Sequence, residues 1–229
     1  MIIDLDIDTF TYPDVPLPDV WTVEQKFDTP TLSAAQVEEQ TRAAVRELVR
    51  ARGLAAGSTV AVGVGSRGLD NLVLTVRSAV AELRALEMQP FIVPAMGSHG
   101  GATPEGQTEV LHGYGITPDA VGAEIRATME VEQIGTLEGE EAGPFAGHPI
   151  FCEKNALGAD AVLPINRIKA HTDFKGDIES GISKMSVIGL GKRHGAESVH
   201  RYGARGLRDL MRRIARWLAA RMPLLGGIA

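Results

Sequence analysis

The residues best suited to chemistry lie between positions 166 and 200, where lysine, histidine and serine side chains alternate with glycine. Lys184 stands there between Ile182 and an apolar run that begins at Met185. An amine in such an apolar, glycine-opened setting loses solvation, so its pKa falls and it becomes a usable nucleophile or covalent tether. The alternative is a lysine whose stem packs on apolar neighbours while its amine stays in water.

The same region argues against two common kinds of site. Gly191-Lys192 is followed by Arg193, and Ser186 occupies the first glycine position, so the Walker-type phosphate loop is not formed. The chain has neither an HExxH motif nor a Cys/His cluster, which disfavours a conventional zinc enzyme. His194 and His200 would face different sides of a helix, so we do not expect them to bind one metal together.

Two further glycine-rich stretches each follow a predicted strand. The first, Gly63-Val64-Gly65-Ser66-Arg67-Gly68, has the spacing of a dinucleotide-binding turn, but the next strand ends without the acid that would hold a ribose. Arg67 offers a planar fork for a carboxylate or phosphate, or else it is solvated on a tight turn. In the second, Gly97-Ser98-His99-Gly100-Gly101, His99 has few neighbours to pack against, so it either faces a ligand or lies on a surface loop.

The elements that must position these loops alternate along the chain. Ser33 and Gln36 form a capping box for a helix that Gly53 and Gly57 end, and Thr103-Pro104-Glu105 begins another helix. We also expect strands at 59–64, 91–95, 149–152 and 161–165, and helical segments at 69–86, 154–157 and 207–222. The prolines of the first thirty residues indicate edge strands or a hairpin arm, and residues 122–147 give no clear pattern. Alternating strands and helices predict an α/β fold with a largely parallel sheet flanked by helices.

Composition and charge narrow the classes of function. A net charge of −6 provides no basic surface for nucleic acid, and the basic run from Arg205 to Arg221 has the pattern of a solvated helix face. The single cysteine, Cys152, excludes an intrachain disulfide. No signal peptide is evident, and no apolar run approaches the roughly 18 residues of a membrane span, so we expect a cytoplasmic protein without membrane contact.

The order of the motifs is more specific than any one of them. Arg67 lies in a turn after a strand, His99 lies within Gly-Ser-His-Gly-Gly followed by Thr-Pro-Glu, and His171, Ser180-Gly-x-x-Lys184 and His200 come later. In this order the chain resembles the nickel-dependent lactate racemase family and its wider 2-hydroxy-acid racemase relatives. The resemblance covers most of the chain from about residue 59 onward.

This resemblance implies a racemase or epimerase that moves the C2 hydrogen of a 2-hydroxy acid reversibly as hydride. Lys184 would carry a covalently attached nickel-pincer nucleotide, which is a thiolated pyridinium mononucleotide, and His200 would complete the nickel coordination. His99 and His171 would be the paired acid and base, and Arg67 would orient the substrate carboxylate. Inversion needs a base on each face of the substrate, and imidazole suits neutral pH. The other residues expected at the cofactor are Gly65, Gly97, Ser180 and Gly181.

Members of this family have a second α/β domain that closes over the cofactor. We therefore expect residues 1–203 to form an amino-terminal cofactor-tethering and catalytic domain. We expect residues 204–229 to form a helix and the start of a connection to a second domain, with the natural reading frame continuing past Ala229. The expected partners are a small-molecule 2-hydroxy acid and the cofactor-biosynthesis proteins, and a homo-oligomer is compatible with the sequence.

The sequence leaves open the identity of the substrate and the choice between three functions. The stretch from His171 to Lys184 is longer than in the lactate enzymes, so the identity of the hydroxy acid is not determined. Two other functions compete with the racemase interpretation. One is a non-catalytic anion- or nucleotide-binding domain that is never loaded with cofactor. The other is a nicotinamide-dependent oxidoreductase, which the missing ribose acid disfavours.

Overall fold

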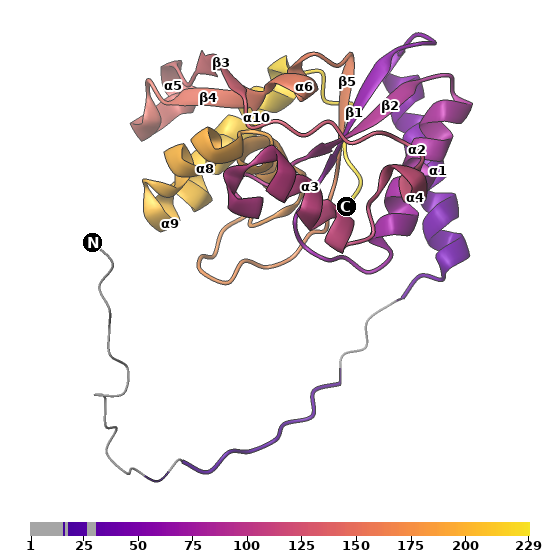
Figure 1. The fold of residues 1–229 in the computed structure, drawn as a ribbon. Helices are drawn as coiled ribbons and strands as arrows, with labels where there is room; N and C mark the ends of the chain where they lie inside the picture. Colours follow the sequence, from indigo (N-terminus) through magenta and orange to yellow (C-terminus); the bar gives the residue numbers. More distant parts are fainter. Residues whose placement is uncertain (1–15, 17, 27–30) are drawn as a thin grey trace. The chain divides into compact units, whose positions relative to one another are not determined.

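The computed structural model of the chain describes residues 16, 18–26 and 31–229 (Figure 1). The chain divides into two units, Met1–Thr31 and Leu32–Ala229. The described residues of the first unit form neither helix nor strand, and most of the expected hairpin arm lies outside the described residues. Within the described residues, no helix is long and apolar enough to cross a membrane.

The second unit alternates strands with helices, as the sequence predicts. Its strands are β1 (Thr59–Val64), β2 (Gln89–Pro94), β3 (Val131–Thr136), β4 (Pro149–Glu153) and β5 (Ala161–Ile165). Its α-helices are α1 (Ala34–Arg52), α2 (Leu72–Ala85), α3 (Pro104–Gly113), α4 (Pro118–Val121), α5 (Gly139–Ala142), α6 (Lys154–Leu157), α7 (Gly181–Lys184), α8 (Lys192–His200), α9 (Gly203–Arg205) and α10 (Met211–Arg221). The 3-10 turns are η2 (Gly100–Ala102) and η3 (Gly143–Phe145), and the π-helical turns are η4 (Met185–Gly189) and η5 (Gly206–Leu210).

A three-stranded parallel sheet in the order β2-β1-β5 lies at the centre of this unit. Isolated parallel bridges extend both edges of the sheet. Ile125 pairs with Ile92 of β2, and Leu224 and Ile228 pair with residues of β5. Helices lie on both sides of the sheet (Figure 1). The predicted α/β fold with a largely parallel sheet flanked by helices is confirmed.

Two hydrophobic cores form because alternate residues of a strand face opposite sides of the sheet. Val60, Val62 and Val64 of β1 face the core that α1 and α2 cover. Ala61 faces the second core, which contains apolar residues of β4, α8 and α10. The sheet is therefore covered on both faces, as parallel sheets require.

Local signals fixed the ends of two helices correctly. The Ser33 hydroxyl accepts from the Gln36 N–H while the Gln36 side chain accepts from the Ser33 N–H, and Gly53 ends α1 in the left-handed conformation at φ 67°. The Thr103 hydroxyl accepts from the Gly106 N–H at the start of α3. Both predictions are confirmed.

Other boundaries differ from the prediction. Helix α2 begins at Leu72 rather than at residue 69, because residues 65–71 form the turn that follows β1. Strand β2 covers 89–94 rather than 91–95. Strand β3 was not predicted; it pairs antiparallel with β4 in a separate two-stranded sheet whose register shifts between Gln133 and Gly135.

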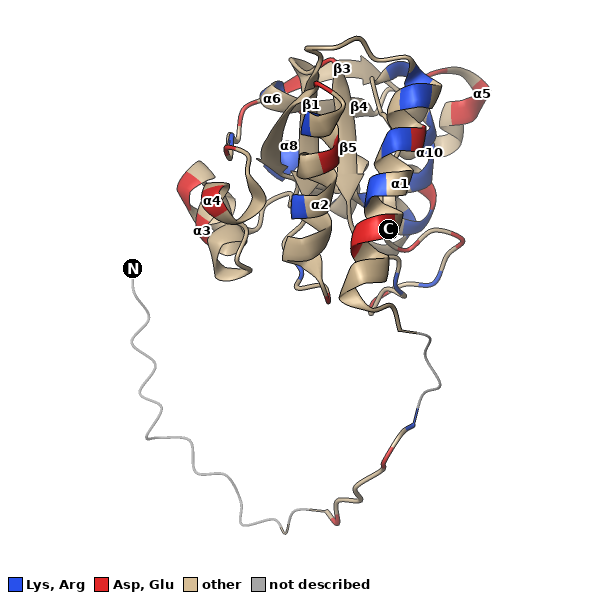
Figure 2. Cartoon of the chain, turned by 90° about the vertical axis from the view of Figure 1, so that its right-hand side faces the viewer, with Lys and Arg blue, Asp and Glu red and all other residues tan. Residues whose placement is uncertain are grey.

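The carboxyl-terminal segment packs into the same unit as the rest of the fold. Leu207, Leu210, Ile214 and Leu218 of η5 and α10 lie in the second core. The arginines of α10, whose positions Figure 2 marks in blue along the helix, are half-buried or exposed. The amphipathic helix expected at 207–222 is confirmed, while a connection to a further domain stays a prediction.

Candidate active site

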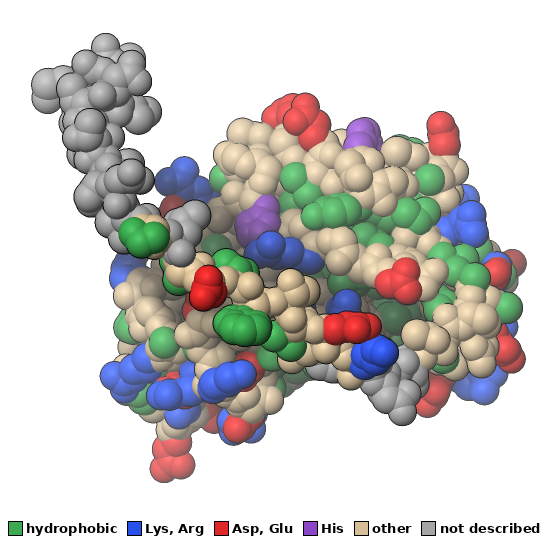
Figure 3. Space-filling model, turned by 90° about the horizontal axis from the view of Figure 1, so that it is seen from below, with side chains coloured by type: hydrophobic (Ala, Val, Ile, Leu, Met, Phe, Trp, Pro, Cys, Tyr) green, Lys and Arg blue, Asp and Glu red, His purple; other side chains and the backbone are tan. Residues whose placement is uncertain are grey.

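Three loops leave the same edge of the central sheet. The turn at residues 65–68 follows β1, the segment at 95–103 follows β2, and the segment at 166–180 follows β5. Because the three strands are parallel neighbours, their carboxyl ends lie together, which is where open α/β sheets bind ligands. Figure 3 shows this side of the molecule, where histidine and basic side chains lie beside a hollow.

The three loops enclose a cavity of about 260 Å³ together with α7 and η4. Six of the residues singled out in the sequence line it. They are Gly65, Arg67, His99, His171, Ser180 and Lys184. Residues more than a hundred positions apart in the sequence are thus brought into one cavity.

The lining of this cavity is strongly basic. Arg67, Arg167, Lys169 and Lys184 all contribute to it, and none of the lining residues is Asp or Glu. Several like charges around one concave site focus a positive potential into it. The site is therefore suited to an anion such as a carboxylate or phosphate.

Lys184 is the last residue of α7 and is half-buried. Burial lowers the pKa of its amine, and the positive charges of Arg67 and Lys169 lower it further, while Asp173 opposes the shift. The π-helical turn η4 follows directly, closed by the Leu190 N–H on the Met185 carbonyl at 2.9 Å. The sequence-based expectation of a lowered lysine pKa is confirmed in direction.

His99 occupies the loop after β2 and lies against the turn after β1. Its Nδ1 is 2.5 Å from the Ser66 hydroxyl oxygen. Burial lowers its pKa, and the charges of Arg67 and Lys184 add to the effect. His99 is therefore neutral at neutral pH and can accept a proton.

His171 is fixed by its own loop. Its backbone N–H donates to the Glu179 carboxylate at 2.7 Å, and its Nδ1 accepts from the Asp173 N–H at 3.1 Å. Because Nδ1 is an acceptor here, the neutral ring carries its proton on Nε2. Burial lowers the pKa of His171, with a further contribution from the charge of Lys184.

Ser180 closes the base of the same loop. Its hydroxyl donates to the Lys169 carbonyl and accepts from the Lys169 N–H at 2.7 Å. The Glu179 carboxylate accepts from Gly176 as well as from His171. In this structure Ser180 therefore holds the loop, although it was predicted as a cofactor contact.

Three predicted residues do not line the cavity. Gly181 starts α7 with φ 74°. Gly97 is buried, and its N–H donates to the Gly189 carbonyl at 3.1 Å. His200 ends α8, yet it lies close enough to His171 for its charge to lower the pKa of that histidine.

The orientation of the His200 ring has a chemical consequence. Its Nδ1 is 2.6 Å from the Ala196 carbonyl oxygen, which can only accept, so Nδ1 carries the proton. The lone pair of the neutral ring is then on Nε2. A metal-binding histidine commonly donates its other nitrogen to a backbone carbonyl in this way.

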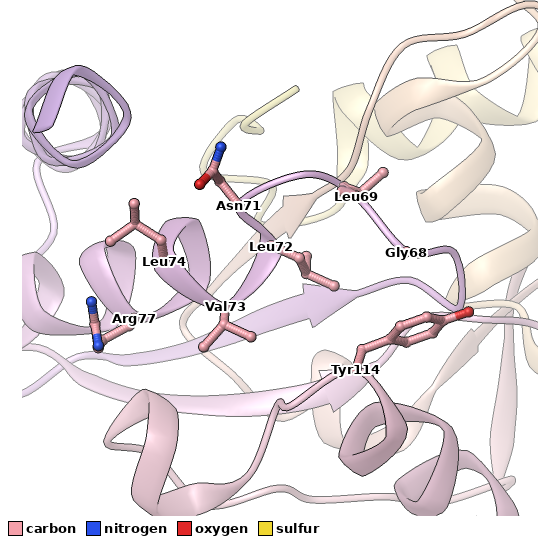
Figure 4. Close-up of a pocket in the computed structure, with 8 residues that line it drawn as sticks. All are labelled: Gly68, Leu69, Asn71, Leu72, Val73, Leu74, Arg77 and Tyr114. Carbon is pink, nitrogen blue, oxygen red and sulfur yellow. The ribbon is translucent and has the colours of Figure 1, made fainter. Parts of the chain in front are cut away.

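A second hollow, of about 400 Å³, is lined by residues between 68 and 77 around the start of α2 and by Tyr114 (Figure 4). Its lining is mostly apolar, with Arg77 as its one charged side chain. The Tyr114 hydroxyl at its edge donates to the Ser66 carbonyl at 3.0 Å. The hollow lacks paired acid–base groups, so size alone does not make it the reactive site.

The turn after β1 differs from a dinucleotide-binding turn. Its last glycine, Gly68, is followed by three residues before α2 begins at Leu72. Asn71 caps that helix at φ 57°, and its side chain accepts no hydrogen bond from the helix backbone. The glycines therefore do not open directly onto the helix N-terminus that would hold a pyrophosphate.

Sequence reasoning missed two residues that support the site. Lys192 is completely buried, and Gln107 is buried beside it. In the sequence, Lys192 stands out only as part of an incomplete phosphate-loop motif, and Gln107 belongs to no recognisable pattern. Neither has a local sequence signal, because only the tertiary fold brings them together.

Comparison of the sequence with models of known protein families gives no match, and neither does a search of curated proteins.

Proposed function

We propose that this chain binds a 2-hydroxy acid in the basic cavity and takes part in its racemisation or epimerisation, with a nickel-pincer nucleotide tethered to Lys184. The observation that carries the proposal is the convergence of Arg67, His99, His171 and Lys184 on one cavity at the carboxyl edge of the sheet. A carboxylate binder, two imidazoles and an amine are the groups that this chemistry needs from the protein.

The residues present fit the cofactor. The amine of Lys184 is half-buried with a lowered pKa, which favours covalent attachment. His200 directs the lone pair to Nε2, as a single metal ligand would. Among the described residues, no group of three or more His, Cys, Asp or Glu side chains could hold a metal. A metal that arrives with its own carbon and sulfur ligands needs no such group.

The protein's own part in the reaction is to bind the acid and move one proton. When bound, the cofactor would supply the electrophile that accepts the C2 hydrogen with its electron pair. Arg67 pairs with the substrate carboxylate and holds C2 in place. His99, neutral at neutral pH, accepts the hydroxyl proton as the alcohol becomes a ketone.

His171 plays the same part for the other enantiomer, from the opposite face. To accept a proton at Nε2, its ring proton must first move to Nδ1. That step displaces the Asp173 N–H, at a cost of about 1 kcal/mol for one hydrogen bond. His171 is thus ready in the resting site as a hydrogen-bond donor at Nε2, whereas the position of the ring proton on His99 follows from the direction of its contact with the Ser66 hydroxyl.

The second candidate is a non-catalytic anion-binding domain. The lining of four basic residues without an acid favours it equally, because those charges bind an anion with or without a cofactor. The two candidates differ in catalysis and in whether Lys184 becomes covalently modified.

Intact mass separates these candidates. The chain is produced together with cofactor-biosynthesis proteins and weighed, alongside the Lys184→Ala and Lys169→Ala variants. We expect a cofactor-sized increment on the wild-type chain and on Lys169→Ala, but none on Lys184→Ala. Lys169→Ala is the matched control, because Lys169 lines the same cavity and its replacement removes one positive charge, as Lys184→Ala does.

Two results would count against the tether. In the first, the wild-type chain gains no mass under loading conditions but still binds a carboxylate. That result favours the anion-binding domain. The other is an increment that survives in Lys184→Ala, which places the attachment elsewhere.

A further inference from the structure

Lys192 is an unusual residue for the place it occupies. It is 0% exposed, although lysine is almost never fully buried unless it is paired. It also adopts φ 52°, a left-handed conformation that is uncommon for a residue with a side chain. Burial lowers the pKa of its amine to about 8, with Glu153 opposing the shift. A buried cation in a strained conformation carries a free-energy cost, so its contacts call for an explanation.

The contacts of Lys192 lead to His99. Its amine donates to the Pro94 carbonyl at the end of β2 and to the Gln107 side-chain oxygen at 2.9 Å. The amide nitrogen of Gln107 then donates to the Gly97 carbonyl at 2.8 Å and to the His99 carbonyl at 3.2 Å. One side chain of α3 therefore holds two carbonyls of the His99 loop, and Lys192 holds that side chain.

Close backbone packing leaves this loop few other positions. The Gly97 N–H donates to the Gly189 carbonyl of η4 at 3.1 Å. An alanine Cβ at Gly100 would lie 2.5 Å from the Gly106 carbonyl carbon of α3. The loop is thus enclosed by α3 and η4, and the Lys192–Gln107 contacts fix its register between them.

We propose that Lys192 and Gln107 are positioning residues that fix the His99 backbone at the edge of the basic cavity. Neither residue lines that cavity, so they act through the loop and do not touch a substrate. The positioning itself does not depend on a cofactor. Only its catalytic consequence rests on the proposed function.

The charges around His99 make the proposal testable. The pKa of His99 is lowered by burial and then by Arg67 and Lys184. Lys192 is absent from these causes, so a change at Lys192 reaches His99 through the position of the loop. If the loop loosens, the ring becomes better solvated and its pKa rises toward the ordinary 6.5.

The experiment is a histidine NMR titration of the full chain without cofactor. It compares the wild type with Lys192→Met, Gln107→Leu and the double variant. Lys154→Met makes the same chemical change at an exposed lysine and serves as the matched control. His148 is the internal control, because burial and the Arg201 charge lower its pKa independently of this loop.

We expect each single variant to raise the pKa of His99 while that of His148 stays lowered. If the two residues act in one chain of contacts, the double variant shifts His99 no further than the larger single variant. Lys154→Met leaves both histidines unchanged. Retention of the lowered His148 pKa shows that the chain is still folded.

An unchanged His99 pKa in folded Gln107→Leu would overturn the proposal, as would fully additive shifts in the double variant. If Lys192→Met fails to fold, Gln107→Leu alone decides the question, because it leaves Lys192 bonded to Pro94. A negative mass result at Lys184 does not affect this titration, so failure of the proposed function and failure of this inference are distinguishable.

Discussion

The ring nitrogens of two histidines are assigned by the backbone groups beside them. The Asp173 N–H donates to Nδ1 of His171, whereas Nδ1 of His200 donates to the Ala196 carbonyl. His171 therefore offers an N–H and His200 offers a lone pair, each at Nε2. Two histidines of the same region thus differ at Nε2, where one donates a hydrogen bond and the other offers a lone pair. The neighbouring backbone groups determine this difference.

The lowered pKa of Lys192 predicts that the free energy of unfolding depends on pH. Its pKa is about 8 in the folded chain and near the ordinary 10.5 in the unfolded chain. Between these values the unfolded chain binds more protons, so the free energy of unfolding rises with pH. One pKa unit corresponds to about 1.4 kcal/mol, so the gain is on the order of 3 kcal/mol.

Urea unfolding at pH 7.5 and at pH 10 measures this effect. Other groups also titrate in this range, so the relevant quantity is the difference between wild type and Lys192→Met. We expect the wild type to gain stability relative to the variant as pH rises. Parallel pH profiles for the two proteins would show that Lys192 has an ordinary pKa in the folded state.

The loop between β2 and α3 gives a prediction at the scale of elements. Gly100 and Gly101 both have left-handed backbone, with φ values of 64° and 65°. Alanine at either position carries the left-handed penalty of about 1–2 kcal/mol. At Gly100 the added Cβ also meets α3, whereas at Gly101 nothing lies within 4 Å. Gly101→Ala therefore carries the backbone penalty without the clash, so the difference between the two variants measures the clash with α3.

We expect Gly100→Ala to lose more stability than Gly101→Ala, by about 1–3 kcal/mol, in urea unfolding at constant pH. Equal losses would mean that α3 and the loop do not approach each other as closely as described. The contact matters for the site because this packing encloses the His99 loop.

The elements that the sequence predicts correctly carry their own local signals. The Ser33 box and the Thr103 cap are chemical contacts within one turn of helix, so they need no tertiary information. Strand β3 lacks such a signal, because it is mostly polar, half-exposed and interrupted at Gly135. The short helix at Gly181–Lys184 was also not predicted, since glycine and polar residues surround it and hide any periodicity.

The residues of the candidate site also fall into two groups, those that the sequence predicts and those that it does not. Residue types and motif order predicted Arg67, His99, His171 and Lys184, and the fold brings these four to one cavity. The structural role of Ser180 depends on how its own loop folds back onto Lys169. The Lys192–Gln107 contact joins chain segments that are distant in sequence. Such contacts arise from tertiary packing, which no local pattern records.

At the scale of the whole molecule, the distribution of charge agrees with the site. The chain has a net charge of −6, yet the cavity is lined by four basic side chains and no acidic one. A basic cavity on an acidic protein concentrates small anions at one place. The proposed carboxylate substrate fits this arrangement.

The fate of the hydrogen on C2 distinguishes the proposed hydride transfer from removal of a proton. A racemase that removes it as a proton passes it to a base, which exchanges with solvent before a hydrogen returns. If it leaves with its electron pair instead, His99 and His171 handle the hydroxyl proton alone. Exchange of that proton leaves no label on carbon.

The decisive measurement is racemisation in deuterium oxide by the complete, cofactor-loaded protein, with the C2 position examined by NMR or mass spectrometry. We expect both enantiomers to keep mostly protium at C2, and replacement of either histidine by alanine to lower the rate by roughly 10²–10⁴-fold. Rapid incorporation of deuterium at C2 in step with racemisation would rule out hydride transfer, and would make His99 and His171 the bases that act on carbon.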